Sequence, residues 1–373
     1  MDRWDYSRHG PSTWVEKFPM AAGSRQSPVN IETDRAESDH EALSSKPLRW
    51  KYPSTASKKL VNPGYCWRVD CDGDGTFLTG GPLMDDVYKL EQYHCHWGCS
   101  DSRGSEHTVD GQAFAGELHL VHWNTTKYRT FDDAAKAPDG LAVLGVFLKV
   151  RIKFFYCINR LWTLTNIFFN NLISNFNIYI LKKNKKINYW KKNYLAGINS
   201  WHNQVMGPDK KIFLNNLASS FNVGKTHEEM DKIARMLPYV SHKDEIIDVI
   251  EPIDPSKLLP VRGGRAGRCV NPCMRWADKI MRQDNKCGFQ ADDNGYWTYL
   301  GSLTTPPCNE SVTWVLFKKY IEVSHHQLNI FRNLRKFPRG EECPCHENHG
   351  VVINNFRPPL PLGNRVLREC GSF

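Results

Sequence analysis

The sequence lacks a continuous apolar run of about 20 residues, which is the length that a membrane-spanning helix requires. The most apolar stretch, residues 161–181, contains five asparagines whose side chains would have to lose their water inside a membrane. The first residues of the chain also lack the apolar core of a secretory signal peptide. We therefore expect neither a membrane protein nor a secreted one.

A disulfide scaffold is absent as well. Twelve cysteines in 373 residues are too few for a fold that depends on disulfides, and several lie in atypical segments or in the tail. One short run, CPCHENH, could bind a metal ion, although we favour a solvated loop. Its candidate ligands are Cys343, Cys345, His346 and His349.

The positive charge is confined to two segments. The formal net charge of the chain is +9, but residues 151–222 contribute +10 and residues 261–290 contribute +5, which leaves −6 for the rest. A basic face that would attract nucleic acid or a membrane surface therefore does not follow from the total. We expect no nucleic-acid partner and no membrane partner.

These two segments differ from their surroundings in composition, and the first shows no sustained helical or strand period. Each begins with Val-Arg, at Val150-Arg151 and at Val261-Arg262, as a splice donor translated in frame can encode, and the second ends at Gln290, which an acceptor could encode. We hypothesise that one or both are translated introns. Genuine loop insertions, and a chain too disrupted to fold, remain as alternatives.

The rest of the chain reads as strands and turns. Short runs rich in β-branched, aromatic and leucine residues, separated by Gly, Pro and Asp, predict strands at residues 76–83, 88–98, 116–124 and 141–150. The clearest helix is expected at residues 226–237, with Thr226 as its N-cap and acidic residues in its first turn. The predicted class is mainly β with a few short helices.

The run HCH in residues 94–96 indicates a metal site. On a strand, residues i and i+2 face the same side, so His94 and His96 project together about 7 Å apart. His119 lies in the next predicted strand, across what we expect to be a hairpin-sized connection. Three neutral imidazoles around Zn²⁺ leave a fourth position open, which is typical of a catalytic site. For any one of these histidines alone, an ordinary hydrogen-bonded role would be the more common explanation.

Several motifs, in order and at close to family spacing, resemble those of the α-class carbonic anhydrases. The resemblance covers nearly the whole chain outside the two atypical segments, and it implies one domain over residues 1–373, interrupted at 151–222 and 261–290. The implied fold surrounds a large, twisted, mostly antiparallel sheet with a conical cavity that ends at zinc. The motifs are RQSPVNI, GGPL, HCHWG, SEHTVDG, ELHLVHWN, DGLAVLGVFLKV, YWTYLGSLTTPP and VTWVLF.

The resemblance implies the reversible hydration of CO₂ to bicarbonate and a proton, by attack of a zinc-bound hydroxide. It makes His94, His96 and His119 the zinc ligands. Thr304 matches the threonine that accepts a hydrogen bond from the hydroxide, and Glu106 the carboxylate that accepts the threonine's own proton. The remaining matches are acceptors for the outer ring N–H groups (Gln92, Glu117 and the backbone of Asn355) and the apolar wall for CO₂ (Val121, Val143, Leu303 and Trp314).

One departure from the family pattern concerns proton export. Tyr65 occupies the proton-shuttle position, where the fastest members have a histidine. A phenol with an ordinary pKa of about 10 carries protons poorly near neutrality, whereas an imidazole at about 6.5 is well matched. We expect catalysis to persist, with proton export limiting it, and Arg68 to make the nearby wall more positive.

The resemblance also bears on compartment and on an alternative function. Secreted relatives carry a disulfide, one half of which matches Cys308, but no cysteine stands in PMAAGSRQSPV, where the other half would fall. This favours a reducing, cytoplasmic setting, and we expect a monomer. The alternative is a non-catalytic carbonic anhydrase-related binding protein. Such proteins typically lose a zinc histidine, and this chain keeps all three.

Overall fold

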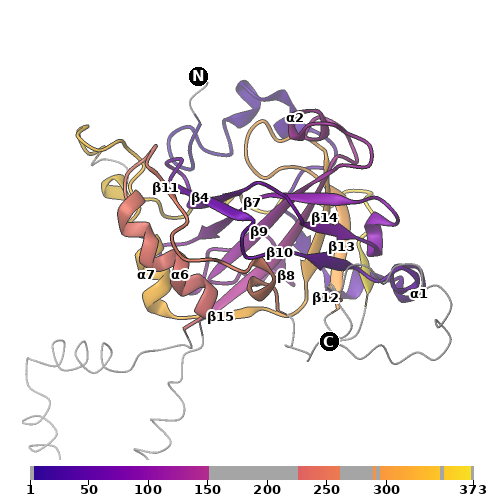
Figure 1. Ribbon diagram of the computed structural model, residues 1–373. Coiled ribbons are helices and arrows are strands. Elements are labelled where there is room, and N and C mark those ends of the chain that lie inside the picture. The colour runs from indigo at the N-terminus through magenta and orange to yellow at the C-terminus, as the bar shows by residue number, and fades with distance from the viewer. Residues whose placement is uncertain (1–3, 151–225, 261–288, 291–294, 345–347, 371–373) are drawn as a thin grey trace, which may run out of the picture. The chain divides into compact units, whose positions relative to one another are not determined.

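The structure, a computed structural model, describes residues 4–150, 226–260, 289–290, 295–344 and 348–370 (Figure 1). Residues 1–150 and 225–373 group into one compact unit. The atypical segment 151–222 lies outside the described residues, as does 261–290 apart from its last two residues. Cys345 and His346 of the CPCHENH run also lie outside them.

A large twisted sheet dominates the described chain (Figure 1). Ten of its strands form a continuous path, in the order β11, β4, β5, β7, β9, β10, β14, β13, β16, β2. In that order they span Ile246–Asp248, Ser57–Val61, Arg68–Cys71, Tyr88–Trp97, Gly116–Asn124, Leu141–Val150, Val312–Phe317, Tyr296–Gly301, Arg368–Cys370 and Glu37–Ser38.

Four short strands pair beside this path, and two more form a small parallel pair of their own. The four are β3 (Arg49–Lys51), β6 (Phe77–Thr79), β12 (Phe289–Gln290) and β15 (Ile321–Val323). The separate pair is β1 (Asn30–Ile31) and β8 (Thr108–Val109).

The sheet is mixed, with antiparallel pairing in the majority, as expected. Strand β10 runs antiparallel to β9 but parallel to β14 and β15, and β16 runs parallel to β2. The central strands β9, β10 and β14 are buried along nearly their whole length. Burial on both faces explains why β10 and β14 are almost continuously apolar in sequence. Strand β9 is equally buried but also carries polar residues, two of them histidines. These three strands therefore form a rigid support for any side chain they carry.

Three of the four predicted strands form with little change, as β7, β9 and β10. The segment 76–83 forms only the short strand β6, followed by a 3₁₀ turn at Gly81–Leu83. Gly80 and Gly81 have φ angles of 81° and 54°, a left-handed conformation that ends the strand and that glycine adopts at no steric cost.

The connection between β7 and β9 is longer than predicted. The two strands are antiparallel neighbours, as expected, but residues 98–115 join them and include the short strand β8. Strand β8 pairs with β1, near the amino-terminal end of the described chain. The expectation of a hairpin-sized connection was therefore wrong, because this segment makes tertiary contacts of its own that include Glu106.

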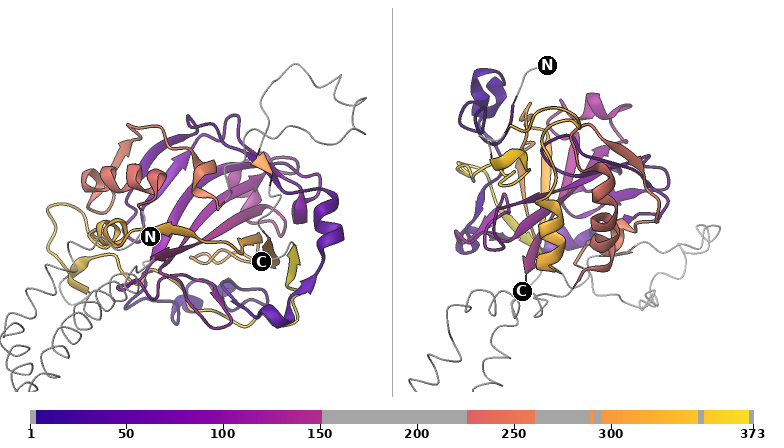
Figure 2. Two further views of the ribbon diagram at one scale, coloured as in Figure 1. Left: turned by 90° about the horizontal axis from the view of Figure 1, so that it is seen from below. Right: turned by 90° about the vertical axis from the view of Figure 1, so that its left-hand side faces the viewer.

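Within the described residues, the helices are few and short. They are α1 (His40–Ser45), α2 (Phe131–Ala134), α6 (Glu228–Met236) and α7 (His325–Phe331). Single 3₁₀ turns occur at Trp14–Glu16, Pro19–Ala22, Thr33–Arg35, Leu237–Val240, Pro255–Leu258 and Asn348–Gly350. Figure 2 shows α6 and α7 side by side, and contacts between them agree with that view.

The predicted helix at 226–237 is α6, but its N-cap is His227 and Thr226 is outside it. The Nδ1 atom of His227 accepts a hydrogen bond from the Met230 N–H at 3.4 Å. The backbone of His227 is in turn tied to Gln327 of α7, by bonds of 3.2 Å and 2.8 Å. This contact with α7 fixes the position of the N-cap. It could not be predicted from the residues around His227.

Candidate metal centre

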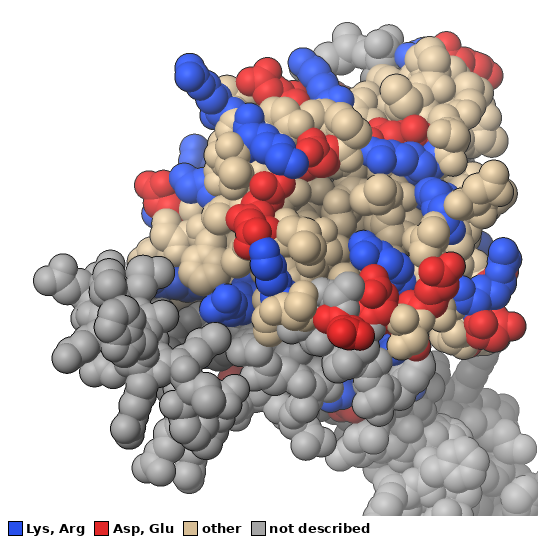
Figure 3. All heavy atoms as spheres, turned by 90° about the vertical axis from the view of Figure 1, so that its right-hand side faces the viewer, with Lys and Arg blue, Asp and Glu red and all other residues tan. Residues whose placement is uncertain are grey.

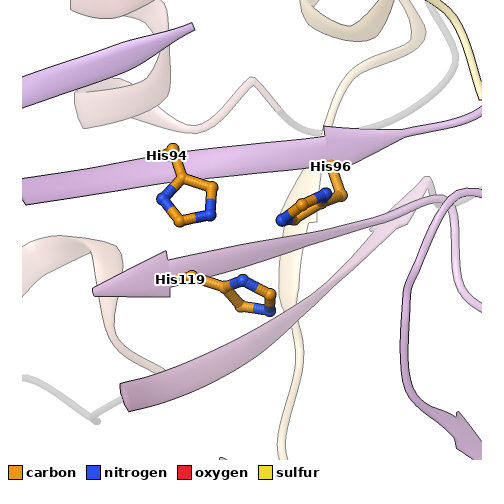
Figure 4. A group of neighbouring side chains, drawn as sticks. All are labelled: His94, His96 and His119. Carbon is orange, nitrogen blue, oxygen red and sulfur yellow. The ribbon is translucent and has the colours of Figure 1, made fainter. Parts of the chain in front are cut away.

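Strands β7 and β9 bring three imidazoles together (Figure 4). His94 and His96 project from the same face of β7, and His119 stands directly opposite His94 on β9. One ring nitrogen from each lies within 4.8 Å of those of the other two. The centroids of the rings are 4.7–5.2 Å apart. The alternation of the strands therefore produces the expected cluster.

The second ring nitrogen of each histidine is taken by an acceptor. Such a bond fixes the tautomer and the ring orientation, which is the usual arrangement around a metal-binding imidazole. The acceptors are Gln92 Oε1 for His94 Nδ1 (2.8 Å), the Asn355 carbonyl for His96 Nδ1 (2.6 Å) and Glu117 Oε1 for His119 Nε2 (2.8 Å).

The remaining nitrogens fit a zinc ion. His96 Nε2 is buried and has no hydrogen-bond partner, which is costly unless something else binds it. Burial lowers the pKa of His96 to about 3 and also lowers the pKa of His94 and of His119. All three rings are thus held neutral, which is the form that binds metal ions. Three neutral nitrogen donors suit Zn²⁺.

Glu106 is completely buried beside these rings. Its Oε1 accepts the Arg357 N–H at 2.8 Å, while its Oε2 lies 3.4 Å from His96 Nε2 and has no hydrogen-bond partner. Burial and the nearby Glu117 raise the pKa of Glu106 well above its ordinary value. Thr304, also buried, lies close enough to lower that pKa, yet no bond of hydrogen-bonding geometry joins the two side chains here.

Sequence reasoning missed a buried network behind His119. Glu117 Oε1 accepts from His107 Nδ1 at 2.7 Å as well as from His119, and Glu117 Oε2 accepts two backbone N–H groups. His107 Nε2 then accepts from the Tyr299 hydroxyl at 2.7 Å, which contacts the Ser27 hydroxyl at 2.8 Å. His107 follows Glu106 in a motif that the sequence singled out, but its partners are distant in the chain.

The charge on Glu117 is stabilised by these donors. Burial by itself raises the pKa of Glu117, but His107 and the hydrogen bonds from His107 and His119 hold that pKa well below its ordinary value. An ionised carboxylate only accepts hydrogen bonds, so both histidines donate to it. His107, Glu117 and His119 also form a possible metal-binding group, but their facing atoms are already hydrogen-bonded to one another. We interpret that group as an extension of the first.

Arg357 is the second group that sequence reasoning missed. Besides holding Glu106 through its backbone, it donates from its guanidinium to Gln26 Oε1 and to the Ser27 carbonyl, at 2.8 Å and 2.9 Å. A third bond reaches the Ala21 carbonyl at 3.0 Å. The amino-terminal segment and Glu106 are thereby fastened to the same residue. A lone arginine in sequence carries no signal of this role.

The four residues expected to form the apolar wall lie together. Val121 stands opposite Val143, and Val143 stands opposite Trp314. All three are at most 3% exposed, and Leu303 packs against the same cluster. The Trp314 ring is 4.9 Å from that of His119. An uncharged surface therefore borders the histidine cluster at His119.

Tyr65 and Arg68 differ from the simplest expectation. Burial raises the pKa of Tyr65 to about 12, which makes its phenol a still poorer proton carrier. Arg68 pairs with Asp70 through two bonds of 2.6 Å and 3.1 Å. Asp70 on the same strand therefore largely balances the positive charge of Arg68. The cavity wall near Arg68 is less positive than the sequence alone suggested.

Two further features concern partners. Figure 3 shows acidic and basic side chains interspersed over one face, with neither sign gathered into a patch. Among the described residues, no helix is both long enough and apolar enough to span a membrane. Cys308 is a buried free thiol.

Comparison with known proteins gives one consistent result. A sequence profile of the eukaryotic-type carbonic anhydrases matches residues 9–194 and 283–371. The chain is 33% identical over 369 residues to carbonic anhydrase 7 of Homo sapiens, which covers 98% of this chain and 96% of that protein. It is 32% identical to carbonic anhydrase 7 of Mus musculus, over 98% of this chain and 96% of that protein. It is 31% identical to carbonic anhydrase 5A, mitochondrial, of Homo sapiens, over 95% of this chain and 79% of that protein.

The profile match is split, which is consistent with an insertion between residues 195 and 282. The unmatched region does not coincide with the two atypical segments, because the profile also matches residues 151–194 and 283–290. The large mixed sheet and the few short helices agree with the fold that the sequence motifs implied. Since the profile covers more than half of the chain and the relatives nearly all of it, this protein belongs to the eukaryotic-type carbonic anhydrase family.

Proposed function

We propose that this protein is a zinc enzyme that hydrates CO₂ reversibly to bicarbonate and a proton. The observation that carries the proposal is the group of three neutral imidazoles, two buried and that of His94 half-buried, each oriented by an acceptor on its outer nitrogen. His94, His96 and His119 would hold the ion. A bound zinc ion would lower the pKa of a water molecule to about 7, so that hydroxide is available near neutral pH.

Thr304 and Glu106 would orient the attacking oxygen. An ionised Glu106 can only accept, so the Thr304 hydroxyl must donate to it and can then accept a hydrogen bond from the attacking hydroxide. The unpartnered Oε2 of Glu106, beside the histidines, is the acceptor available for that bond. A cation at the histidines favours the ionised carboxylate, which burial alone disfavours.

The apolar wall would receive the substrate. CO₂ is linear and uncharged, so a surface of Val121, Val143, Leu303 and Trp314 binds it without having to desolvate a charge. Bicarbonate carries a charge and is disfavoured against the same surface. The wall therefore supports both the approach of the substrate and the departure of the product.

The alternative is a non-catalytic relative that keeps the fold and binds a partner. Two measurements on the purified chain separate these functions: zinc content per molecule and the rate of CO₂ hydration at saturating substrate. The proposal requires about one zinc per chain together with hydration that a chelator abolishes. A chain that binds zinc and leaves the hydration rate at the uncatalysed level would refute it and favour the binding protein.

We also propose a monomer in a reducing, cytoplasmic compartment. The free thiol of Cys308 supports the compartment, although one relative is named as mitochondrial. Light scattering tests the first proposal and localisation of the tagged chain tests the second. A stable dimer, or a chain found in an organelle, would contradict them.

Finally, we propose that residues 151–222 and 261–290 are interruptions of a single domain and that one or both are translated introns. The described strands form a connected sheet on either side of them, which supports this view. Sequencing the transcript tests it. A major transcript that contains both segments would contradict the intron hypothesis.

A further inference from the structure

A short segment near the carboxyl end of the described chain contacts the candidate centre twice. The carbonyl of Asn355 accepts from His96 Nδ1 at 2.6 Å, and two residues later the N–H of Arg357 donates to Glu106 Oε1 at 2.8 Å. His96 lies on β7, whereas Glu106 lies in the connection from β7 to β9. The relative position of these two buried side chains therefore depends on where the segment 355–357 is held.

The side chain of Asn355 holds one end of this segment. Its Oδ1 accepts the Trp97 N–H at 2.7 Å, and its Nδ2 donates to the carbonyls of Tyr65 and Cys95 at 2.8 Å and 3.3 Å. Cys95 and Trp97 flank His96 on β7. This end is therefore tied to the strand that carries the imidazole.

The guanidinium of Arg357 holds the other end. The residue is buried, with 3% of it exposed. Its guanidinium nitrogens donate to Gln26 Oε1 at 2.8 Å, to the Ser27 carbonyl at 2.9 Å and to the Ala21 carbonyl at 3.0 Å. The centroid of the Trp14 ring lies 5.5 Å from the guanidinium carbon. This end is therefore fixed to the amino-terminal segment by several directed contacts.

The chemistry of these contacts favours a role in geometry over a role in stability. All three acceptors of the Arg357 guanidinium among the described residues are neutral oxygens, so its charge leaves water without an ion pair to offset the cost. An apolar side chain of similar size would avoid that cost. It could not make three directed hydrogen bonds, however, and so could not hold the backbone at position 357 in one place.

We propose that Arg357 is a positioning residue for Glu106. Its guanidinium, fixed on the amino-terminal segment, holds the backbone N–H that sets the Glu106 carboxylate and thereby keeps Oε2 beside the histidine cluster. Asn355 holds His96 in the same way, so the two ends of the segment act on different steps. Asn355 acts on metal binding and Arg357 acts on the attack on CO₂. The inference rests on the proposed function and deepens it.

The test is a double-mutant cycle on the zinc-loaded full chain. The value of kcat/KM for CO₂ hydration is measured for the wild type, Arg357→Lys, Glu106→Gln and the double variant. Lysine keeps the charge but places its donors on one nitrogen, so Arg357→Lys should lower kcat/KM at least about tenfold. In the Glu106→Gln background the same change should cost less than about twofold, because the carboxylate that it positions is already gone. Equal losses in the two backgrounds would overturn the proposal.

Arg365 provides the matched control. Its guanidinium likewise donates to three neutral oxygens, and its guanidinium carbon lies 5.4 Å from the centroid of the Tyr299 ring. The acceptors are the carbonyls of Leu362, Leu300 and Pro361. Arg365→Lys and Arg357→Lys should both lower the midpoint of thermal unfolding, but Arg365→Lys should leave kcat/KM within about twofold of the wild type. A similar loss of kcat/KM in both variants would assign the effect to weakened structure and contradict a positioning role.

Zinc affinity separates the two ends of the segment. Arg357→Lys should leave that affinity within about threefold of the wild type, whereas Asn355→Ser should lower it at least about tenfold through His96. Competition with a chelator measures both. If Arg357→Lys lowers zinc affinity as much as it lowers kcat/KM, the arginine acts through His96 and the proposal is wrong.

One further readout needs neither activity nor a variant. Three directed bonds should keep the Arg357 guanidinium from rotating, so its Nη protons should give separate NMR signals. A freely rotating guanidinium would overturn the proposal even if the variants fail to fold. A zinc-loaded wild type without hydration activity would refute the proposed function, whereas an active wild type with unchanged kcat/KM in Arg357→Lys would refute this inference alone.

Discussion

His94 and His119 stand directly opposite each other on the antiparallel strands β7 and β9, with ring centroids 5.2 Å apart. His122, three residues further along β9, points to the other face and contacts the Tyr52 hydroxyl at 2.8 Å. Strand β9 therefore carries two buried histidines: His119 lies inside the candidate centre and His122 lies outside it.

Replacing a histidine of the centre should remove zinc. We expect His94→Ala or His119→Ala to abolish CO₂ hydration, because each loses one of three bonds that hold the ion and set its geometry. His122→Gln is the matched control and should keep about one zinc per chain. Metal content by mass spectrometry checks this prediction, and near-normal activity with zinc retained in His119→Ala would refute the site.

An aromatic sulfonamide should inhibit the enzyme. Its ionised nitrogen can occupy the open ligand position and donate its remaining hydrogen to Thr304. Thr304→Val, which lacks the hydroxyl, should weaken inhibition by at least about tenfold, as expected for the loss of a hydrogen bond to a charged group. Calorimetric titration measures the affinity. Tight zinc binding without any sulfonamide binding would favour a blocked, non-catalytic site.

Glu117→Gln should weaken zinc binding through His119. The neutral amide replaces an acceptor of four hydrogen bonds and places an N–H₂ group against imidazoles that also donate. Loss of such an outer partner typically lowers metal affinity about 10- to 100-fold. Competition with a chelator measures the change. An unaltered zinc affinity would show that His119 is oriented without Glu117.

The zinc-free protein should lose stability as the pH falls. Burial lowers the pKa of His96 and of His122 to about 3, so the folded state binds fewer protons than the unfolded state between that value and about 6.5. The free energy of unfolding should therefore decrease below about pH 6.5, by up to about 1.4 kcal/mol per pH unit for each such histidine. Urea titrations at several pH values measure this slope.

His122→Gln is the control for that pH dependence. It removes one of the groups that must stay neutral, so the slope between pH 6.5 and 5 should become smaller. The Gln side chain can still accept the hydrogen bond of Tyr52, which limits other effects on stability. A slope identical to that of the wild type would show that the protonation of His122 does not oppose folding.

Much of this site could be predicted from short stretches of sequence. The two-residue period of a strand was enough to place His94 and His96 on one face, and the leucine, valine and tryptophan residues of 116–124 predicted a second strand with His119. Strands β7, β9 and β10 were predictable because each is a short run of strand-forming residues bounded by turn residues, and such a run is a local feature of the sequence. The pairing of β10 parallel to β14, more than 160 residues away, depends on no local pattern.

The sequence by itself determined that the three histidines lie on strands and that His94 and His96 share a face, because spacing along an extended backbone fixes which side chains point the same way. Only the tertiary structure decided what surrounds these residues. It brings the Asn355 carbonyl to His96 across 259 positions, sets His107 behind Glu117, and packs the Trp4 ring against that of Tyr65. Such contacts join segments with no common period, so their geometry exists only once the sheet and its long connections have packed together.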